Sequence, residues 1–185
     1  MDLKERILLQ TIELFNKKGL KFTMDDIAVS LKISKKTIYT VFNNKDKLLI
    51  SMVNYIFDSI KQSEKEIFEN ENYTTVDKIR AILGALPEGY KDIDFRQLHC
   101  LKDKYPDIYK QVEVRLETGW ESTIWLLEKG KEEGVIRDVK IPLIKLMLES
   151  VVEQFFQRDV LIKNEISYAE ALDEVVNIII DGIKV

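Results

Sequence analysis

Apolar residues recur at intervals of three and four along almost the whole chain, the spacing that lines one face of an α-helix. Ile7, Thr11, Leu14 and Phe15 mark one face of a helix near the start of the chain, and Val176 and Ile179 show the same spacing near the end. Residues that interrupt helices are scarce, with only 7 glycines and 3 prolines among 185 residues. A sandwich or barrel would need more turn residues, so the sequence predicts an all-α fold.

The charge is unevenly distributed along the chain. Residues 1–50 hold ten Lys or Arg against six Asp or Glu, whereas residues 51–185 hold 18 against 26. A basic head on an acidic body is expected when one end of a protein meets a polyanion.

The start of the chain and its cysteine content indicate an intracellular, cytoplasmic protein. The single cysteine, Cys100, cannot form an internal disulfide. The first six residues carry four charges, unlike a signal peptide, and apolar runs such as residues 175–180 are far shorter than a bilayer span. No membrane partner is expected.

Residues 23–42 have the pattern of two short helices joined by a minimal turn. Thr23 begins the first helix, and Asp26 follows at the spacing of a capping box. After a two-residue connection, Ser34 is the N-cap candidate of a second helix over 35–40.

A helix-turn-helix needs a small residue where its helices approach, apolar residues that lock them, and a polar or basic outer face. Ala28 is the small residue. The locking residues are Ile27, Leu31, Ile33, Ile38 and Phe42. The outer face, which would enter a major groove, consists of Lys35, Lys36, Thr37, Tyr39 and Thr40.

Over about residues 3–50 the sequence resembles the TetR family of transcriptional regulators. The matching residues are Ile7, Leu14, Phe15, Gly19, Thr23, Ile27, Ala28, Ser34, Thr37, Ile38, Tyr39, Phe42, Lys45 and Leu48. A weaker likeness surrounds Gly130, Gly134 and Pro142. Two residues depart from the family pattern: Lys32 replaces the usual glycine of the turn, and Lys36 stands where a small residue is common. A non-glycine residue in a left-handed turn costs roughly 1 kcal/mol.

The resemblance implies a homodimeric repressor that binds a palindromic operator and leaves it when a small-molecule inducer binds the C-terminal domain. It implies that Lys35, Thr37 and Thr40 face base edges, while Tyr39 and Lys45 contact phosphates and Lys36 adds a further phosphate contact. The expected DNA-binding residues are Thr23, Ser34, Lys35, Lys36, Thr37, Tyr39, Thr40 and Lys45.

These features predict an N-terminal three-helix DNA-binding domain over 1–46 and a helical ligand-binding and dimerisation domain over 47–185. From residue 45 onward, helices are expected over about 45–69, 75–86, 95–102, 107–133, 141–158 and 167–182.

Aromatic residues of the second domain are, as a set, a candidate ligand pocket, although for each residue taken singly a place in the core is the favoured interpretation. The tentative pocket set is Phe95, His99, Tyr109, Trp120 and Phe155. On one continuous helix over 107–133, Trp120 and Trp125 would point about 140° apart, so Trp120 is assigned to the pocket and Trp125 to packing. The acidic body and its aromatics favour an apolar or cationic aromatic inducer.

The last two helices carry more apolar surface than one internal face can use. This favours a four-helix bundle formed between two copies of the chain. The tentative dimer interface is Val151, Phe155, Leu172, Val175, Val176 and Ile179.

Signals for catalysis are poor. The sequence has no phosphate loop, no metal-ligand spacing and no nucleophile elbow. His99 and Cys100 are adjacent and would point about 100° apart on a helix, so they do not form a nucleophile and base pair. No enzyme activity, cofactor or metal is expected. Two alternatives stay open: a body that binds a protein instead of a small molecule, and an enzyme that carries such a head.

Overall fold

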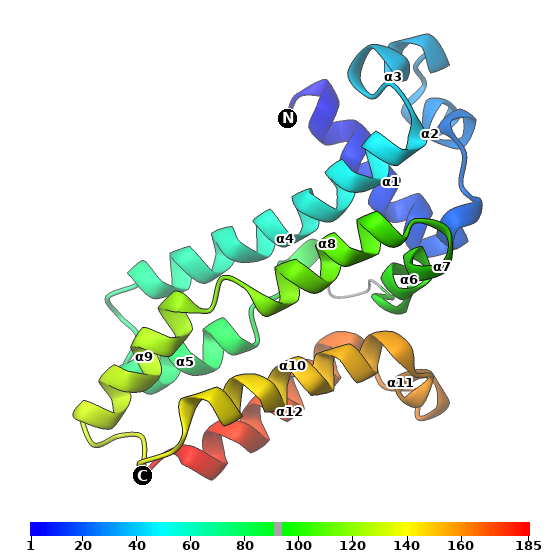
Figure 1. Ribbon diagram of the computed structural model, residues 1–185. Coiled ribbons are helices and arrows are strands. Elements are labelled where there is room, and N and C mark those ends of the chain that lie inside the picture. The colour runs from blue at the N-terminus through cyan, green and yellow to red at the C-terminus, as the bar shows by residue number, and fades with distance from the viewer. Residues whose placement is uncertain (91–93) are drawn as a thin grey trace. The chain divides into compact units, whose positions relative to one another are not determined.

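The computed structural model describes residues 1–90 and 94–185, and within them every regular element is helical, apart from one isolated bridge between Ile136 and Lys184 (Figure 1). The predicted all-α fold is thus confirmed. The elements are α1 (Leu3–Lys18), η1 (Gly19–Lys21), α2 (Met24–Leu31), α3 (Lys35–Val41), α4 (Lys45–Glu69), α5 (Thr75–Leu83), η2 (Glu88–Tyr90), α6 (Arg96–His99), α7 (Leu101–Lys104), α8 (Pro106–Glu117), α9 (Glu121–Glu132), α10 (Ile141–Gln157), α11 (Val160–Lys163) and α12 (Tyr168–Ile183).

The chain forms two compact units. The first holds residues 1–58 and 94–113, and the second holds the described residues between 59 and 93 together with 114–185. Helix α4 runs without a break from the first unit into the second. No helix of the described residues is long and apolar enough to cross a membrane.

The first unit combines α1, α2, α3 and the start of α4 with α6, α7 and most of α8. Asp2 caps the N-terminus of helix α1, because its carboxylate accepts a hydrogen bond from the Glu5 backbone N–H at 2.7 Å. Residues 94–113 are linked to α1 by a hydrogen bond, in which the Asp94 backbone N–H donates to the Asn16 side chain at 2.7 Å. The fully buried core side chains of the helical head are Ile7, Phe22, Ile27, Ile38, Leu48, Leu49 and Met52.

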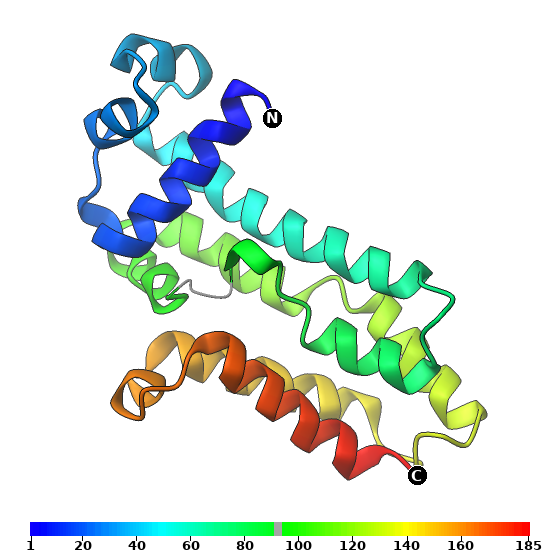
Figure 2. The same cartoon turned by 180° about the vertical axis from the view of Figure 1, so that it is seen from behind.

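The second unit contains two packed helix pairs. Helices α5 and α9 approach closely at Gly130 of α9, where an added Cβ would lie 3.5 Å from Ile79 Cδ1 of α5. Helices α10 and α12 run side by side in opposite directions (Figures 1 and 2). Arg80 of α5 joins the pairs, because its guanidinium donates to Asn177 and, at 2.9 Å, to Asp181 of α12.

The predicted single helix over 107–133 is wrong. The structure has α8 and α9 instead, separated by Gly119 at a φ of 80°. Carbonyl groups left open by this break accept hydrogen bonds from side chains: Leu116 O from Trp120 Nε1 at 3.1 Å, Glu117 O from Lys145 at 2.9 Å, and Gly119 O from Lys61 at 2.8 Å. These donors replace the helical hydrogen bonds that the break removes.

Three other expectations about helix bounds also need correction. The helix expected over 75–86 ends at Leu83, with Gly84 as its C-cap. The helix expected over 95–102 is instead α6 and α7, which meet at Cys100. The short helix α11 was not expected at all. The other predicted helices agree with the structure to within one or two residues.

Candidate nucleic-acid interface

Helix α2 begins with a complete capping box. The Thr23 hydroxyl accepts from the Asp26 backbone N–H at 3.1 Å, and the Asp26 carboxylate accepts from the Thr23 backbone N–H at 2.8 Å. Lys18 also donates to Asp26 at 2.8 Å, and these bonds, with the Lys18 ammonium first, lower the pKa of Asp26 to about 2. The charged carboxylate thus fixes the start of the helix, as the spacing predicted.

The turn between α2 and α3 is left-handed at Lys32, with φ 55° and ψ 42°. The Lys32 N–H donates to Val29 O at 3.2 Å, and the Ile33 N–H donates to Ala28 O at 3.0 Å. These bonds close the end of α2 in the manner of a Schellman motif. Of the two possibilities that the sequence leaves open, a turn that tolerates lysine or a turn of different geometry, the structure shows the first.

Helix α3 is locked on one side and exposed on the other. Ser34 Oγ accepts from the Thr37 backbone N–H at 3.0 Å, which confirms Ser34 as N-cap. Ile38 is fully buried, and Phe42 is buried just past the helix end. The residues exposed around this short helix are Ser34, Lys35, Lys36, Tyr39 and Thr40, while Thr37 is half-buried. A rigid helix therefore presents a polar and basic face, the arrangement that reads a major groove.

Two hydroxyl groups of this face already have local partners. Thr37 Oγ1 lies 2.8 Å from Ser34 Oγ, and Thr40 Oγ1 donates to Thr37 O at 2.6 Å. Each hydroxyl oxygen has a second lone pair that can still accept a hydrogen bond. Both threonines can therefore meet donor groups on bases without leaving their rotamers.

Lys35 is held by an acid of the preceding helix. Its ammonium lies 2.7 Å from Asp25 Oδ2, with both side chains substantially exposed. The Asp25 carboxylate raises the pKa of Lys35. Lys35 therefore stays fully charged at neutral pH.

Lys45 points into the unit instead of outward. Its ammonium donates to Leu20 O at 2.8 Å and to Phe22 O at 2.5 Å, and it lies 4.1 Å from the centre of the Phe22 ring. Burial lowers the pKa of Lys45, with a smaller contribution from the nearby Lys104. A phosphate contact would require Lys45 to give up these bonds, and the sequence pattern carried no sign of them.

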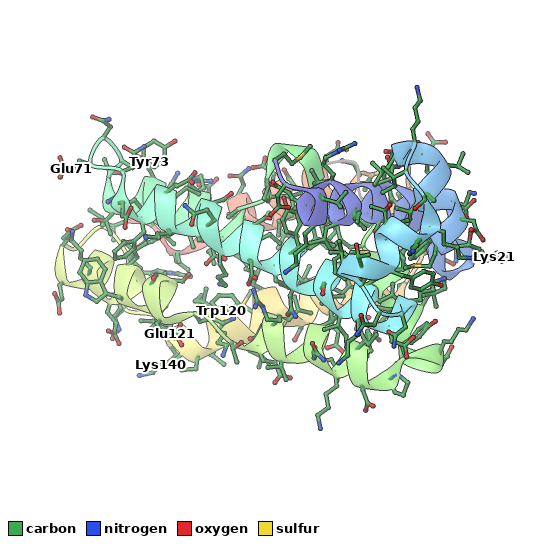
Figure 3. All side chains as sticks on the ribbon, turned by 90° about the horizontal axis from the view of Figure 1, so that it is seen from above. Lys21, Glu71, Tyr73, Trp120, Glu121 and Lys140 are labelled. Carbon is green, nitrogen blue, oxygen red and sulfur yellow. The ribbon has the colours of Figure 1, made fainter. Side chains whose placement is uncertain are left out.

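The residues of the tentative pocket set fall in both units. Phe95 and Tyr109 are buried in the first unit, where Tyr109 Oη lies 3.1 Å from His99 Nδ1. In the second unit, Trp120 is the residue just before α9 (Figure 3) and Phe155 packs edge-on against Tyr168. Of this set, the structure brings His99 and Tyr109 together.

Most residues of the tentative dimer set lie in the core of the second unit. Phe155, Leu172, Val176 and Ile179 are buried there, and the other two members are half-buried. The apolar side chains that α10 and α12 leave exposed are Leu143, Leu146, Met147 and Ile178. Three of these, Leu143, Met147 and Ile178, line a groove of about 280 Å³ between the two helices. In the sequence, the exposed apolar residues of α10 are indicated by the apolar run over 141–148, which only Lys145 interrupts.

The fold and this site define a helix-turn-helix DNA-binding protein. Residues 7–52 match the family model for bacterial regulatory proteins, tetR family. An uncharacterized HTH-type transcriptional regulator of Bacillus subtilis (strain 168), YvaF, is 29% identical over 97% of this chain and 94% of its own length. Residues 7–52 are therefore similar to the DNA-binding domain of the tetR family, and the chain over nearly its whole length is similar to an HTH-type transcriptional regulator.

Solved structures of the family have the same fold. A TetR transcription regulator from Haloarcula marismortui is 16% identical, with a TM-score of 0.74 over 98% of each chain. The TetR family regulator PfmR from Thermus thermophilus is 18% identical, with a TM-score of 0.67 over 95% of this chain and 97% of its own. Among the described residues, no group of three or more His, Cys, Asp or Glu could hold a metal ion.

Proposed function

We propose that this regulator is a dimeric repressor that binds a palindromic operator and releases it when a small molecule binds its C-terminal part. The observation that carries the DNA-binding half of this proposal is the exposed face of α3 on a capped and buried support. A single short recognition helix reads too few base pairs to find one site in a genome. Two copies reading half-sites about 34 Å apart would supply the missing specificity.

We assign base reading to Lys35, Thr37 and Thr40, and phosphate contact to Lys36 and Tyr39. Lys36 and Tyr39 are exposed on the outer face, and a lysine ammonium neutralises a phosphate without regard to sequence. Thr23 and Ser34, at the N-terminal ends of α2 and α3, are assigned to the edge of the same interface. For Lys45, the bonds to Leu20 and Phe22 support a positioning role in place of a direct phosphate contact.

The test begins with genomic fragments selected by the purified wild-type protein. Lys35→Ala should relax preference at particular base positions of the selected fragment and cost about 1–3 kcal/mol there. Lys36→Ala should weaken all duplexes alike and flatten the salt dependence by about 0.9 in log–log slope. Lys65→Ala is the matched control, because Lys65 is an exposed lysine at the far end of α4. Equal losses on selected and random DNA for Lys35→Ala would refute the division of roles.

We propose that α10 and α12 form the dimer interface through the exposed residues Leu143, Met147 and Ile178. Their exposed fractions are 57%, 52% and 64%, which is far above the ordinary value for such side chains. A second copy of the same two helices would cover this face as a four-helix bundle. The buried members of the tentative set would then support the interface from beneath.

We propose that the inducer, an apolar or cationic aromatic compound, binds near Trp120 and shifts the population away from the DNA-binding arrangement. Trp120 is half-buried, and Lys145 lies 5.8 Å from its ring centre. Trp125 is 50% exposed and packs edge-on against Phe68, which supports its assignment to packing.

The inducer proposal is tested by titrating apolar and cationic aromatic compounds while recording tryptophan emission and DNA release. Quenching should follow release in the wild type and in Trp125→Phe, and should vanish in Trp120→Phe. Quenching that survives in Trp120→Phe but is lost in Trp125→Phe would reverse the assignment. DNA release by an added protein partner, with no response to any compound, would favour a protein-binding body.

A further inference from the structure

The turn between α2 and α3 holds a lysine in a backbone conformation that favours glycine. Lys32 has a φ of 55° and a ψ of 42°, the left-handed region in which a Cβ crowds the carbonyl oxygen that follows it. Within residues 1–90 and 94–185, Glu165 is the only other non-glycine residue with a positive φ. A strained residue therefore lies directly beside the helix that is proposed to read DNA.

The side chain of Lys32 does not stabilise the fold. It is exposed, and among the described residues no hydrogen bond or ion pair engages its ammonium group. The bonds that close α2 use only backbone atoms of the turn, such as the Lys32 N–H that donates to Val29 O. Glycine would make the same backbone bonds without the strain. A strained residue whose side chain does not support the fold points to a function outside it.

The place of this ammonium fits a contact with the DNA backbone. Lys32 comes three residues before Lys35 and four before Lys36, the exposed lysines that begin α3. When a helix docks in a major groove through its first turns, the residues just before it come near the phosphates at the edge of the groove. A lysine has a flexible stem and a compact charge, so it can reach such a phosphate and bind it without regard to sequence.

We infer that Lys32 is a DNA-backbone contact that fixes the turn of the helix-turn-helix to a phosphate. This inference rests on the proposed docking of α3 in the major groove. The lysine lowers the stability of the free protein and raises its affinity for DNA. Because its partner is a phosphate, it strengthens binding to the operator and to random DNA alike.

Lys32→Gly is the decisive variant, because its effects on folding and on DNA binding have opposite signs. The urea unfolding midpoint should rise, since glycine removes the strain. Affinity for a random duplex of about 30 base pairs should fall roughly five- to tenfold for each bound copy of the chain at about 0.1 M salt, and the log–log salt slope should flatten by about 0.9 for each copy. A purely structural role would not combine a more stable fold with weaker DNA binding.

Three further variants separate the charge of Lys32 from its backbone. Lys32→Asn removes the charge and keeps a residue that tolerates the left-handed region, so it should lose the same affinity as Lys32→Gly. Lys32→Arg keeps the charge and should keep the wild-type slope. Lys110→Gln removes the charge of an exposed lysine on α8, whose start lies at the opposite end of the first unit from α3 (Figures 1 and 2), and should leave the slope nearly unchanged.

The inference is overturned by an unchanged salt slope in both Lys32→Gly and Lys32→Asn. It is also overturned if the slope flattens as much in Lys32→Arg or in Lys110→Gln, because the effect would then not come from the charge at this place. If Lys36→Ala flattens the slope and Lys32→Asn does not, the contact by Lys32 fails while the docking of α3 stands. If neither Lys35→Ala nor Lys36→Ala changes DNA binding, the docking of α3 fails first, and the inference falls with it.

Discussion

Lys45 brings a positive charge to a point where backbone carbonyls face inward. The carbonyls of Leu20 and Phe22 belong to the connection between α1 and α2, and the lysine itself begins α4. Without the ammonium, these carbonyls would lose a charged donor in a partly buried place. The Lys45 side chain therefore links the start of α4 to the connection between α1 and α2, and so holds the helix-turn-helix against α1 and α4.

Lys45→Met keeps most of the packing and removes the charged donor. We expect the free energy of unfolding to fall by about 1–3 kcal/mol, the usual value of hydrogen bonds to charged groups. Lys47→Met, at an exposed position two residues later, is the control and should be nearly neutral. Urea unfolding measures both. A Lys45→Met protein of unchanged stability whose salt slope on DNA flattens by about 0.9 would instead establish a direct phosphate contact.

Lys32 carries a local strain that glycine would remove. Its φ of 55° is a conformation that costs a side-chain-bearing residue about 1 kcal/mol. Lys32→Gly should raise the free energy of unfolding by about 0.5–1 kcal/mol, since glycine accepts this φ but loses more chain entropy on folding. Lys36→Gly, inside α3, should lower it by about 1 kcal/mol. Urea titrations measure both changes, and destabilisation by both would show that the turn needs the lysine side chain.

Residue-level predictions from the sequence succeed where the cause is local. The capping box of Thr23 and Asp26 and the cap at Ser34 depend on residues within three positions of one another. The inward direction of the Lys45 side chain depends on backbone carbonyls more than twenty residues away in the sequence. Spacing along the chain contains no information about such a contact.

At the scale of elements, the break between α8 and α9 shows how distant donors override a helical pattern. The apolar spacing over residues 107–133 is compatible with one helix, and Gly119 alone does not forbid it. The break is supported by Lys61 from α4 and Lys145 from α10, which satisfy carbonyls at the junction. Both lysines are far from the break in sequence, so the pattern could not predict it.

Gly119→Ala tests this junction. A Cβ at Gly119 would lie 2.8 Å from Lys61 Cε, and the φ of 80° is unfavourable for alanine. The free energy of unfolding should fall by about 1–2 kcal/mol in urea titrations. Gly84→Ala is the matched control, because its φ is −94° and its Cβ would make an ordinary contact at 3.5 Å with Arg80 O. A Gly119→Ala protein as stable as the wild type would mean that α8 and α9 can join without loss.

At the scale of the whole molecule, the sequence predicted an apolar excess on the last two helices but not which side chains face outward. Val176 and Ile179 show 1% and 6% of their surface, whereas Ile178, which lies between them in the sequence, shows 64%. On a helix, residues one position apart point about 100° apart, so a small error in register exchanges core for surface. The packing of α12 on α5 and α10 decides that register.

Ile178→Glu and Met147→Glu test the proposed assembly, because both side chains are exposed within one copy. By twofold symmetry each glutamate enters the interface twice, and leaving it unpaired there should cost roughly 2–6 kcal/mol of association free energy. Sedimentation should show monomers at concentrations where the wild type is dimeric, with operator affinity lost while the helical content of the folded monomer stays that of the wild type. Val176→Glu would instead disrupt the core, so it cannot serve as the test.

Val114→Glu, at a 47% exposed valine of α8, is the control and should leave the dimer intact. A protein that stays dimeric with both Ile178→Glu and Met147→Glu would move the interface away from α10 and α12.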